Sequence, residues 1–173
     1  MVIILAGCDG TGKSTCFKLL KEQMPGNFIK ESYTDEVHVK HIRAEFLISK
    51  LNDKDLTVYD RATILDDLVY EYVMNNNRSY LYNLLGVPTI KEALRKSLII
   101  YFELDEETLK NRLEIRKDDY IKAYQINKIK RFYEETFKNL NLNIRRLNVT
   151  GLSPEQVYNK VRRIIENEEF ENC

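Results

Sequence analysis

The stretch that decides the fold is Gly7-Cys8-Asp9-Gly10-Thr11-Gly12-Lys13-Ser14, which fits the pattern G-x-x-x-x-G-K-[ST]. An apolar run over residues 2–6 precedes it and predicts a buried strand, and apolar residues at helical spacing follow it. A strand, a glycine-rich turn and a helix in this order direct backbone N–H groups and the positive end of a helix dipole toward a phosphate. A chance match in a loop is the alternative, but these flanks favour a phosphate-binding loop. In such a loop Lys13 reaches the β- and γ-phosphates, and the Ser14 hydroxyl binds Mg²⁺.

Length and composition narrow the class of protein. The chain has 173 residues, which suits a single domain, and its 27 basic and 27 acidic side chains give a net charge near zero. This balance disfavours a surface built to bind nucleic acid, although a local basic groove stays open. No apolar run is long enough for a membrane span, and the chain enters its first strand directly, so we expect no signal peptide. Cys8 and Cys16 lack metal-ligand spacing and are expected to be small packing residues. We expect a reducing, cytoplasmic location, or the host cytoplasm if the chain is viral.

Hydrophobic periodicity predicts strands and helices that alternate along the chain. Strands separated by helices imply a parallel sheet covered on both faces, so we expect an α/β three-layer sandwich with a mostly parallel five-stranded sheet. The acidic end, residues 166–173, is expected to be a frayed, solvated tail. The predicted strands lie at residues 2–6, 27–30, 56–59, 98–102 and 144–149, and the predicted helices lie after the loop, at 35–51, from 61, at 89–96, 106–116 and 121–140, and after Ser153 as N-cap.

Polar segments are expected at the carboxyl edge of this sheet, where ligands of parallel sheets bind. They are the loop from Gly7, the pair Lys30-Glu31 and the pair Asp60-Arg61. A carboxylate at the end of a strand can hold Mg²⁺ or accept a proton, and a guanidinium is suited to phosphate. Asp60 is therefore a candidate metal ligand, and Arg61 is a candidate phosphate ligand. The alternative is that Asp60 is the N-cap of the next helix and that Arg61 is a surface residue.

A cluster of cations follows the fourth predicted strand. Arg112 and Arg116 are four residues apart and share a helix face, and Lys117 follows them. Phosphoryl transfer needs positive charge over the γ-phosphate, often on a segment that closes over the site. We therefore interpret residues 112–120 as a lid, and a solvated charged helix is the alternative.

Tyrosines and histidines give weaker signals. Tyr70 belongs to a tyrosine-rich stretch that could stack on a base, although tyrosines at such spacing more often pack against the core with wet hydroxyls. His38 and His41 are not accompanied by a cysteine or carboxylate motif, so we place them on the surface rather than in a metal site.

Together these residues resemble the thymidylate kinase family of nucleoside monophosphate kinases. The phosphate loop is similar to that family's version, which carries an aspartate where Asp9 stands. The match continues in order through most of the chain. The chain departs from the family at Ser32 and Ala62 and is shorter between Glu31 and Asp60, all in parts that build the acceptor pocket. The other matching residues are Thr15 in the loop, Lys30-Glu31, Arg43 in the following helix, Asp60-Arg61, Tyr101-Phe102-Glu103-Leu104 with Leu109, Arg112 and Arg116, and Asp119.

The resemblance implies a kinase that uses ATP and Mg²⁺ to phosphorylate a deoxynucleoside monophosphate, first of all dTMP to give dTDP. Asp9 would meet the sugar 3′-hydroxyl, and Arg43 and Arg61 would hold the acceptor phosphate. Position 11 is threonine rather than arginine, so the lid would supply the catalytic cation, and residues 150–153 fall where the family's backbone meets adenine. The implied nucleotide-binding residues are Gly7, Asp9, Gly10, Thr11, Gly12, Lys13, Ser14, Thr15 and Arg112; the implied acceptor-binding residues are Asp9, Glu31, Arg43, Arg61 and Tyr70; the implied catalytic residues are Lys13, Asp60, Arg61 and Arg116; Ser14 and Asp60 would hold the metal.

Other functions and partners stay open at this point. One alternative is a kinase for deoxynucleosides or for a hydroxyl of a modified base in DNA, and the neutral charge disfavours the DNA version. Another is a non-catalytic nucleotide-dependent switch, but the sequence lacks the Asp-x-x-Gly motif of the GTPase kind, and residues 127–130 lack the acid of its base reader. Small-molecule nucleotides are the expected partners, no membrane is expected, and a homodimer is left open.

Overall fold

The sheet that carries the phosphate loop is parallel, as the sequence predicts. The computed structural model describes residues 1–30, 37–61, 64–74, 87–116 and 123–171. Within them the sheet has five strands in the order β2-β3-β1-β4-β5, and every neighbouring pair is parallel. The strands are β1 (Val2–Ala6), β2 (Asn27–Lys30), β3 (Thr57–Asp60), β4 (Leu98–Glu103) and β5 (Ile144–Asn148).

Burial along the strands explains why the sequence reads as near-continuous apolar runs. Every residue of β1 and β3 is buried, and so are the first five residues of β4. Strands with layers on both of their faces have no solvent side on which to place polar residues. The edge strand β5 is more exposed, and two arginines lie along it.

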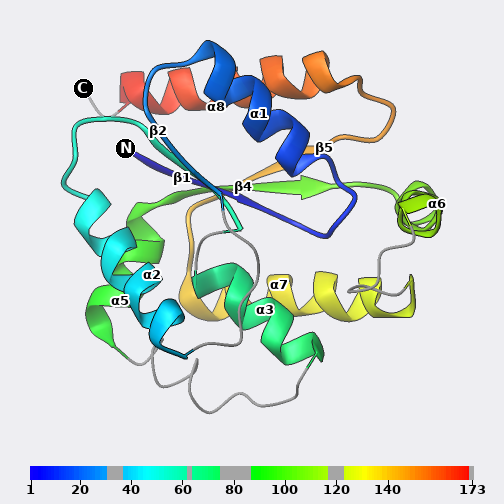
Figure 1. Cartoon of the computed structure of the whole chain (residues 1–173), viewed down its shortest axis with the longest axis horizontal. Coiled ribbons are helices and arrows are strands. Elements are labelled where there is room, and N and C mark those ends of the chain that lie inside the picture. The colour runs from blue at the N-terminus through cyan, green and yellow to red at the C-terminus, as the bar shows by residue number, and fades with distance from the viewer. Residues whose placement is uncertain (31–36, 62–63, 75–86, 117–122, 172–173) are drawn as a thin grey trace.

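Helices cover both faces of the sheet, which confirms the predicted three-layer sandwich. Figure 1 shows α1 and α8 on one face and α2, α3, α5 and α7 on the other. None of the described helices is both long enough and apolar enough to span a membrane. The helices are α1 (Lys13–Gln23), α2 (Val37–Lys50), α3 (Ile64–Met74), α5 (Pro88–Lys96), α6 (Glu106–Arg116), α7 (Ile126–Leu140) after a 3₁₀ turn (Ala123–Gln125), and α8 (Pro154–Glu171).

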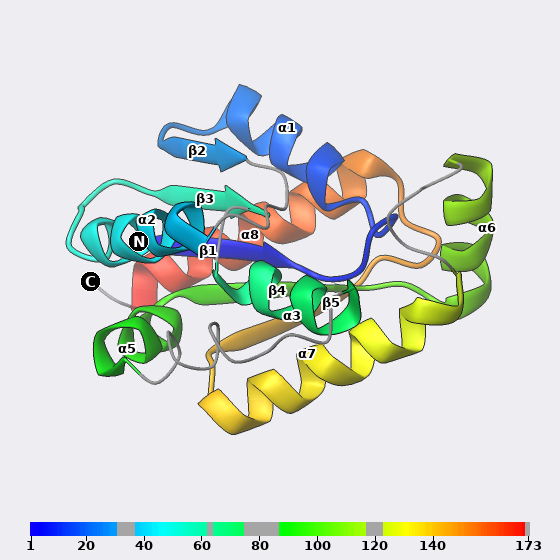
Figure 2. The same ribbon diagram turned by 60° about the horizontal axis from the view of Figure 1, so that its bottom comes forward.

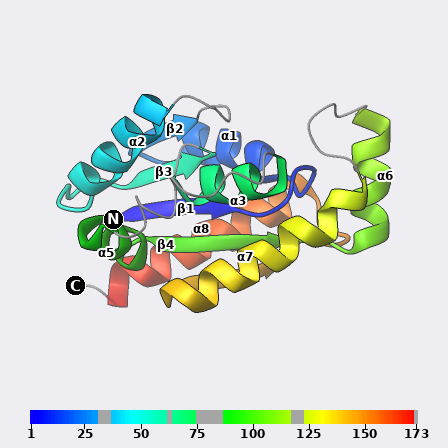
Figure 3. The same ribbon diagram turned by 90° about the horizontal axis from the view of Figure 1, so that it is seen from below.

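Helix α6 does not cover a face of the sheet. Figures 2 and 3 show it beyond the carboxyl end of β4, standing beside the loop that joins β1 to α1. It packs directly on that loop, because a Cβ added at Gly10 would lie 3.0 Å from Leu109 Cδ1 of α6. Loop and α6 therefore meet at the edge where the sequence places the ligand.

The carboxyl end of the chain differs from the prediction of a frayed tail from residue 166. Helix α8 continues to Glu171, and Glu168 is buried against the sheet edge. Its carboxylate contacts Arg145 of β5, with Oε1 2.5 Å from Nη2. This ion pair joins the end of α8 to the edge strand, and a composition-based prediction does not detect such a contact. At the other end of α8 the predicted cap is confirmed, since Ser153 Oγ accepts the N–H of Gln156 at 3.2 Å.

Candidate active site

The phosphate loop connects β1 to α1 and depends on glycine at specific points. Gly7 has φ of 134°, and a Cβ there would lie 2.7 Å from the carbonyl oxygen of Phe102. Gly12 has φ of 95° and directly precedes the first residue of α1. Both glycines therefore have backbone conformations that other residues rarely adopt. They hold the loop at the amino end of α1, where N–H groups and the helix dipole favour an anion.

Lys13 is buried and its ammonium lies inside the loop. Nζ donates hydrogen bonds to the carbonyl oxygens of Gly7 at 2.6 Å and Cys8 at 2.7 Å. Thr11 closes the same turn, since its Oγ1 donates to the Cys8 carbonyl at 2.8 Å. The loop's own carbonyls thus hold its cation close to the N–H groups that would bind a phosphate.

Asp60 ends β3 and is fully buried. Its Oδ2 accepts a hydrogen bond from Ser14 Oγ at 2.8 Å and lies 3.4 Å from Lys30 Nζ. Its Oδ1 is buried without a hydrogen-bond partner in the described part of the chain. The next residue, Arg61, has a positive φ of 62° instead of a helical backbone, so Asp60 is not the N-cap of a helix that begins at Arg61. A buried carboxylate oxygen beside a hydroxyl is the oxygen-only donor set that Mg²⁺ prefers, so these residues fit such an ion.

Asp9, Arg61 and Tyr70 form a second cluster on the α3 side of the loop. The Arg61 guanidinium contacts Asp9 Oδ1, and the Tyr70 hydroxyl donates to Asp9 Oδ2 at 2.7 Å. Arg61 has a left-handed backbone with φ of 62°, which is uncommon for a residue other than glycine. The Tyr70 side chain is buried, and its hydroxyl contacts Asp9. Such strain and pairing are typical of functional sites.

Arg43, which the resemblance assigns to the acceptor phosphate, pairs with a carboxylate in this structure. It is buried, and its Nη1 donates to Asp67 Oδ1 at 2.9 Å, which joins α2 to α3. The neighbouring Asp66 accepts a hydrogen bond at 2.9 Å from the hydroxyl of Tyr133 on α7, and burial raises the pKa of that hydroxyl well above its usual value. Removing one partner of a buried ion pair costs about 3–5 kcal/mol. The Arg43–Asp67 contact therefore belongs to helix packing as much as to a ligand site.

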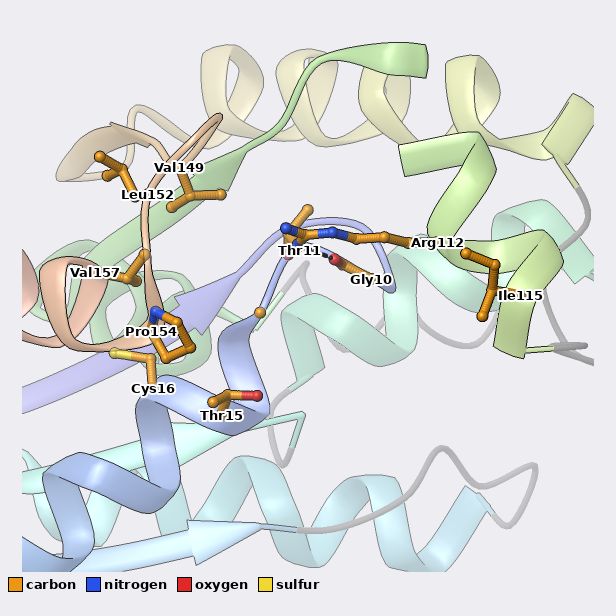
Figure 4. A pocket seen from close by; sticks show the side chains of 11 residues that line it. Gly10, Thr11, Thr15, Cys16, Arg112, Ile115, Val149, Leu152, Pro154 and Val157 are labelled. Carbon is orange, nitrogen blue, oxygen red and sulfur yellow. Dashed lines mark hydrogen bonds between the residues drawn. The ribbon is translucent and has the colours of Figure 1, made fainter. Parts of the chain in front are cut away.

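A cavity of about 320 Å³ opens on the other side of the loop, where α6 and the start of α8 approach it. Arg112 extends from α6 across the loop, and its Nη1 donates to the Gly10 carbonyl at 3.0 Å (Figure 4). The volume of this cavity lies at the lower end of the range for small-molecule sites, which is about 300–1,000 Å³. The lining is polar near the loop and apolar away from it: Gly10, Thr11, Gly12, Thr15, Cys16, Arg112, Ile115, Val149, Leu152, Pro154 and Val157.

The two cysteines beside the loop are buried thiols. Burial raises the pKa of Cys8 to about 11 and that of Cys16 to about 12. Both stay protonated at neutral pH, and a thiol rather than a thiolate is a poor nucleophile. This agrees with the expectation that they are packing residues.

Comparison with known proteins gives relatives at low sequence identity. No family model matches the chain. The SPbeta prophage-derived uncharacterized protein YorR of Bacillus subtilis is 27% identical over 147 residues, covering 82% of this chain and 84% of YorR. A probable thymidylate kinase of Methanococcus vannielii is 20% identical, with 92% of each chain covered.

Solved structures resemble the whole chain. YorR in complex with phosphorylated GDP superimposes with a TM-score of 0.72 at 20% identity, covering 98% of both chains. Deoxyadenosine kinase from M. mycoides with dCMP and dCDP bound superimposes with a TM-score of 0.64 at 15% identity, and the match covers 96% of this chain and 99% of that one. Thymidylate kinase from Candida albicans superimposes with a TM-score of 0.60 at 20% identity, and the match covers 97% of this chain and 92% of that one. The fold is that of the thymidylate kinase-like P-loop kinases.

The kinase fold brings most of the predicted site residues to one edge. Lys13, Ser14 and Asp60 are linked through the loop and β3, and Asp9, Arg61 and Tyr70 form the adjoining cluster. Glu31, Lys117 and Asp119 lie outside the described residues, as does the side chain of Arg116, which ends α6. The side chain of His38 also lies outside the described part of the chain, whereas His41 is exposed and its Nε2 lies 3.1 Å from Glu45 Oε1.

Three contacts of the candidate site were not foreseen from the sequence. The sequence places Lys30 at the carboxyl edge but gives no role to its ammonium, which lies beside Asp60. The sequence also does not predict that Arg43 would form an ion pair with Asp67, or that the Tyr70 hydroxyl would donate a hydrogen bond to Asp9. The first could have been found from the parallel register, since Lys30 and Asp60 are Cα partners on neighbouring strands.

Proposed function

We propose that the protein is an ATP- and Mg²⁺-dependent kinase that phosphorylates a deoxynucleoside monophosphate, and that dTMP is the first acceptor to test. The observation that carries the proposal is the hydrogen bond from Ser14 in the loop to the buried carboxylate of Asp60 at 2.8 Å. It joins a phosphate-binding loop to a carboxylate with an unshared buried oxygen. The Methanococcus relative, named a probable thymidylate kinase, supports the choice of acceptor.

The chain's own residues divide the work of such a transfer. The loop N–H groups and Lys13 bind the donor phosphates and stabilise negative charge that develops on the transferred group. Ser14 and Asp60 would hold Mg²⁺, which supplies electrostatic stabilisation of the phosphate oxygens when bound. Arg112 covers the loop from α6, and the cavity beneath it takes the donor's base and ribose. Asp9 and Arg61 face the acceptor.

A deoxynucleoside kinase is a second candidate that one observation favours. Both arginines expected to hold the acceptor phosphate already face carboxylates, Arg61 facing Asp9 and Arg43 facing Asp67. A pocket whose cations are neutralised in this way suits an uncharged acceptor better than a phosphate dianion. The solved deoxyadenosine kinase shares the fold, although at 15% identity it supports only the fold.

A panel of acceptors decides between the two. Purified protein is given ATP and Mg²⁺ with each deoxynucleoside monophosphate, each deoxynucleoside, and DNA that contains hydroxylated bases, and products are identified by mass. We expect at least one monophosphate to give a higher kcat/KM than its own nucleoside, with dTMP tested first. Transfer to nucleosides but to no monophosphate would replace the proposal with the second candidate, and no transfer to any acceptor would contradict both.

The lid arginines give a further prediction within this function. Arg116→Ala is expected to lower kcat by about 10–100-fold with little change in KM, because a cation used only in the transition state acts on kcat. Arg112→Ala is expected to raise the KM for ATP, since Arg112 lines the donor cavity and bonds the loop. Arg131→Ala on α7, an exposed arginine paired with Glu135, is the matched control. Unchanged kcat in Arg116→Ala at saturating substrates would support the surface-helix alternative.

A further inference from the structure

Lys30 brings a cation to the carboxyl edge of the sheet at the end of β2, where the sequence places a polar segment without giving its ammonium a role. It ends β2, and the register of the parallel pair places it directly beside Asp60 of β3. Its Nζ lies 3.4 Å from Asp60 Oδ2, the same oxygen that accepts the Ser14 hydrogen bond. The ammonium is therefore adjacent to the point where loop, metal ligand and acceptor must meet.

Exposure separates Lys30 from the two arginines. The Lys30 side chain is 49% exposed, that of Arg61 is 35% exposed, and that of Arg43 is 6% exposed. A monophosphate acceptor carries about two negative charges near neutral pH and must reach its cations from solvent. Arg43 is the least exposed of the three, and its guanidinium pairs with the buried Asp67 of α3.

Position and chemistry agree with this difference in exposure. Lys30 and Arg61 flank Asp60, one on the neighbouring strand and the other next in the chain. A phosphate bound between them would lie beside the carboxylate that faces Ser14 and the donor loop. Lysine has a flexible four-carbon stem, so its ammonium can turn from Asp60 to a bound phosphate without a movement of the strand.

We infer that Lys30, together with Arg61, binds the phosphate group of the acceptor, and that Arg43 fastens α2 to α3 instead. This assignment rests on the proposed function, because it requires a phosphorylated acceptor. It makes Lys30 a specificity residue, since its ammonium distinguishes a monophosphate from the nucleoside that lacks the phosphate. The Lys30–Asp60 contact then has two functions, namely to compensate a buried carboxylate and to keep the ammonium at the acceptor site.

The test compares ligands with and without the phosphate group, each on protein with and without the Lys30 ammonium. Calorimetry measures the Kd of the monophosphate preferred in the acceptor panel and of its nucleoside, without ATP, for the wild type and for Lys30→Met. We expect the preference for the monophosphate to fall about tenfold in Lys30→Met, the size of one charge-assisted contact. The KM for ATP is expected to stay within about twofold, and Lys30→Arg is expected to keep most of the preference.

Controls separate this role from a structural one. Lys18→Met removes an exposed lysine of α1 that pairs with Glu22 and should leave the preference unchanged. If Lys30→Met lowers the melting temperature or kcat but keeps the full preference, Lys30 only compensates Asp60 and the assignment is wrong. It is also wrong if Arg43→Met folds and loses the preference in its place. If the wild type binds and phosphorylates no monophosphate, the proposed function itself fails.

Discussion

Lys13→Ala is expected to lower kcat by about 10³-fold or more, because removal of one preorganised charge from a phosphoryl-transfer site costs at least as much as loss of an oxyanion donor. The lysine follows Gly12 as the first residue of α1, and its side chain is buried inside the loop. The variant loses the ammonium that the carbonyls of Gly7 and Cys8 now hold. Steady-state kinetics with saturating ATP and acceptor measures the effect.

Two comparisons keep this result from being a folding artefact. Lys13→Met keeps the aliphatic stem that packs in the loop and should lose turnover to the same degree, while its melting temperature stays close to that of the wild type. Lys18→Ala, in the same helix and exposed, should retain normal turnover. Near-normal phosphoryl transfer by folded Lys13→Ala would contradict the kinase interpretation of the loop.

The parts of this site that the sequence predicts are those encoded by local geometry. The loop is recognisable because Gly7 and Gly12 have backbone conformations that few other residues adopt, and the pattern of glycines and lysine spans only residues 7–14. Asp60 is recognisable because an apolar strand ends in a carboxylate, and in a parallel sheet that end faces the ligand. The sandwich itself follows from alternating strands and helices, which the described elements reproduce.

The parts that the sequence does not predict depend on partners that are distant in the chain. An arginine at position 43 suits a phosphate or a carboxylate equally well, and its partner Asp67 lies 24 residues away on another helix. The Tyr70 hydroxyl reaches Asp9 across 61 residues, which no periodicity encodes. Glu168 and Arg145 similarly meet only because α8 returns along the sheet edge. Side-chain chemistry sets which contacts are permitted, and the packing of the elements selects among them.

The same packing shows how charges are arranged at the carboxyl edge of the sheet. Asp9, Asp60 and Asp67 each face a cation, namely Arg61, Lys30 and Arg43 in turn. Asp60 also accepts a hydrogen bond from a hydroxyl of the phosphate loop, that of Ser14. Under the proposed function Asp60 is the carboxylate that completes the donor site, so its replacement is expected to have a larger effect on turnover than replacement of the other two.

Asp60→Asn is expected to lower kcat by about 10²–10³-fold and to raise the Mg²⁺ concentration required for half-maximal rate. Asparagine keeps the size of the side chain and an oxygen that can accept the Ser14 hydrogen bond, but it removes the charge that Mg²⁺ prefers. Kinetics at several Mg²⁺ concentrations measures both kcat and the Mg²⁺ requirement. Thermal unfolding with Mg·ADP measures the affinity for the metal complex without turnover, because a ligand that binds the folded state raises its stability according to its affinity.

The outcome for Asp60 also distinguishes a metal ligand from a structural carboxylate. Ser14→Ala should also raise the Mg²⁺ concentration required for half-maximal rate, since Ser14 Oγ donates a hydrogen bond to Asp60 Oδ2 at the same point. Asp53→Asn, at a half-buried aspartate paired with Lys50 at 2.6 Å, should change neither kcat nor the Mg²⁺ dependence. If Asp60 is purely structural, Asp60→Asn should lower the melting temperature and leave the Mg²⁺ requirement unchanged, because the variant would alter the contacts with Lys30 and Ser14 but no metal site. A shift in the Mg²⁺ requirement of Asp60→Asn that exceeds its loss of stability would place the metal at the end of β3.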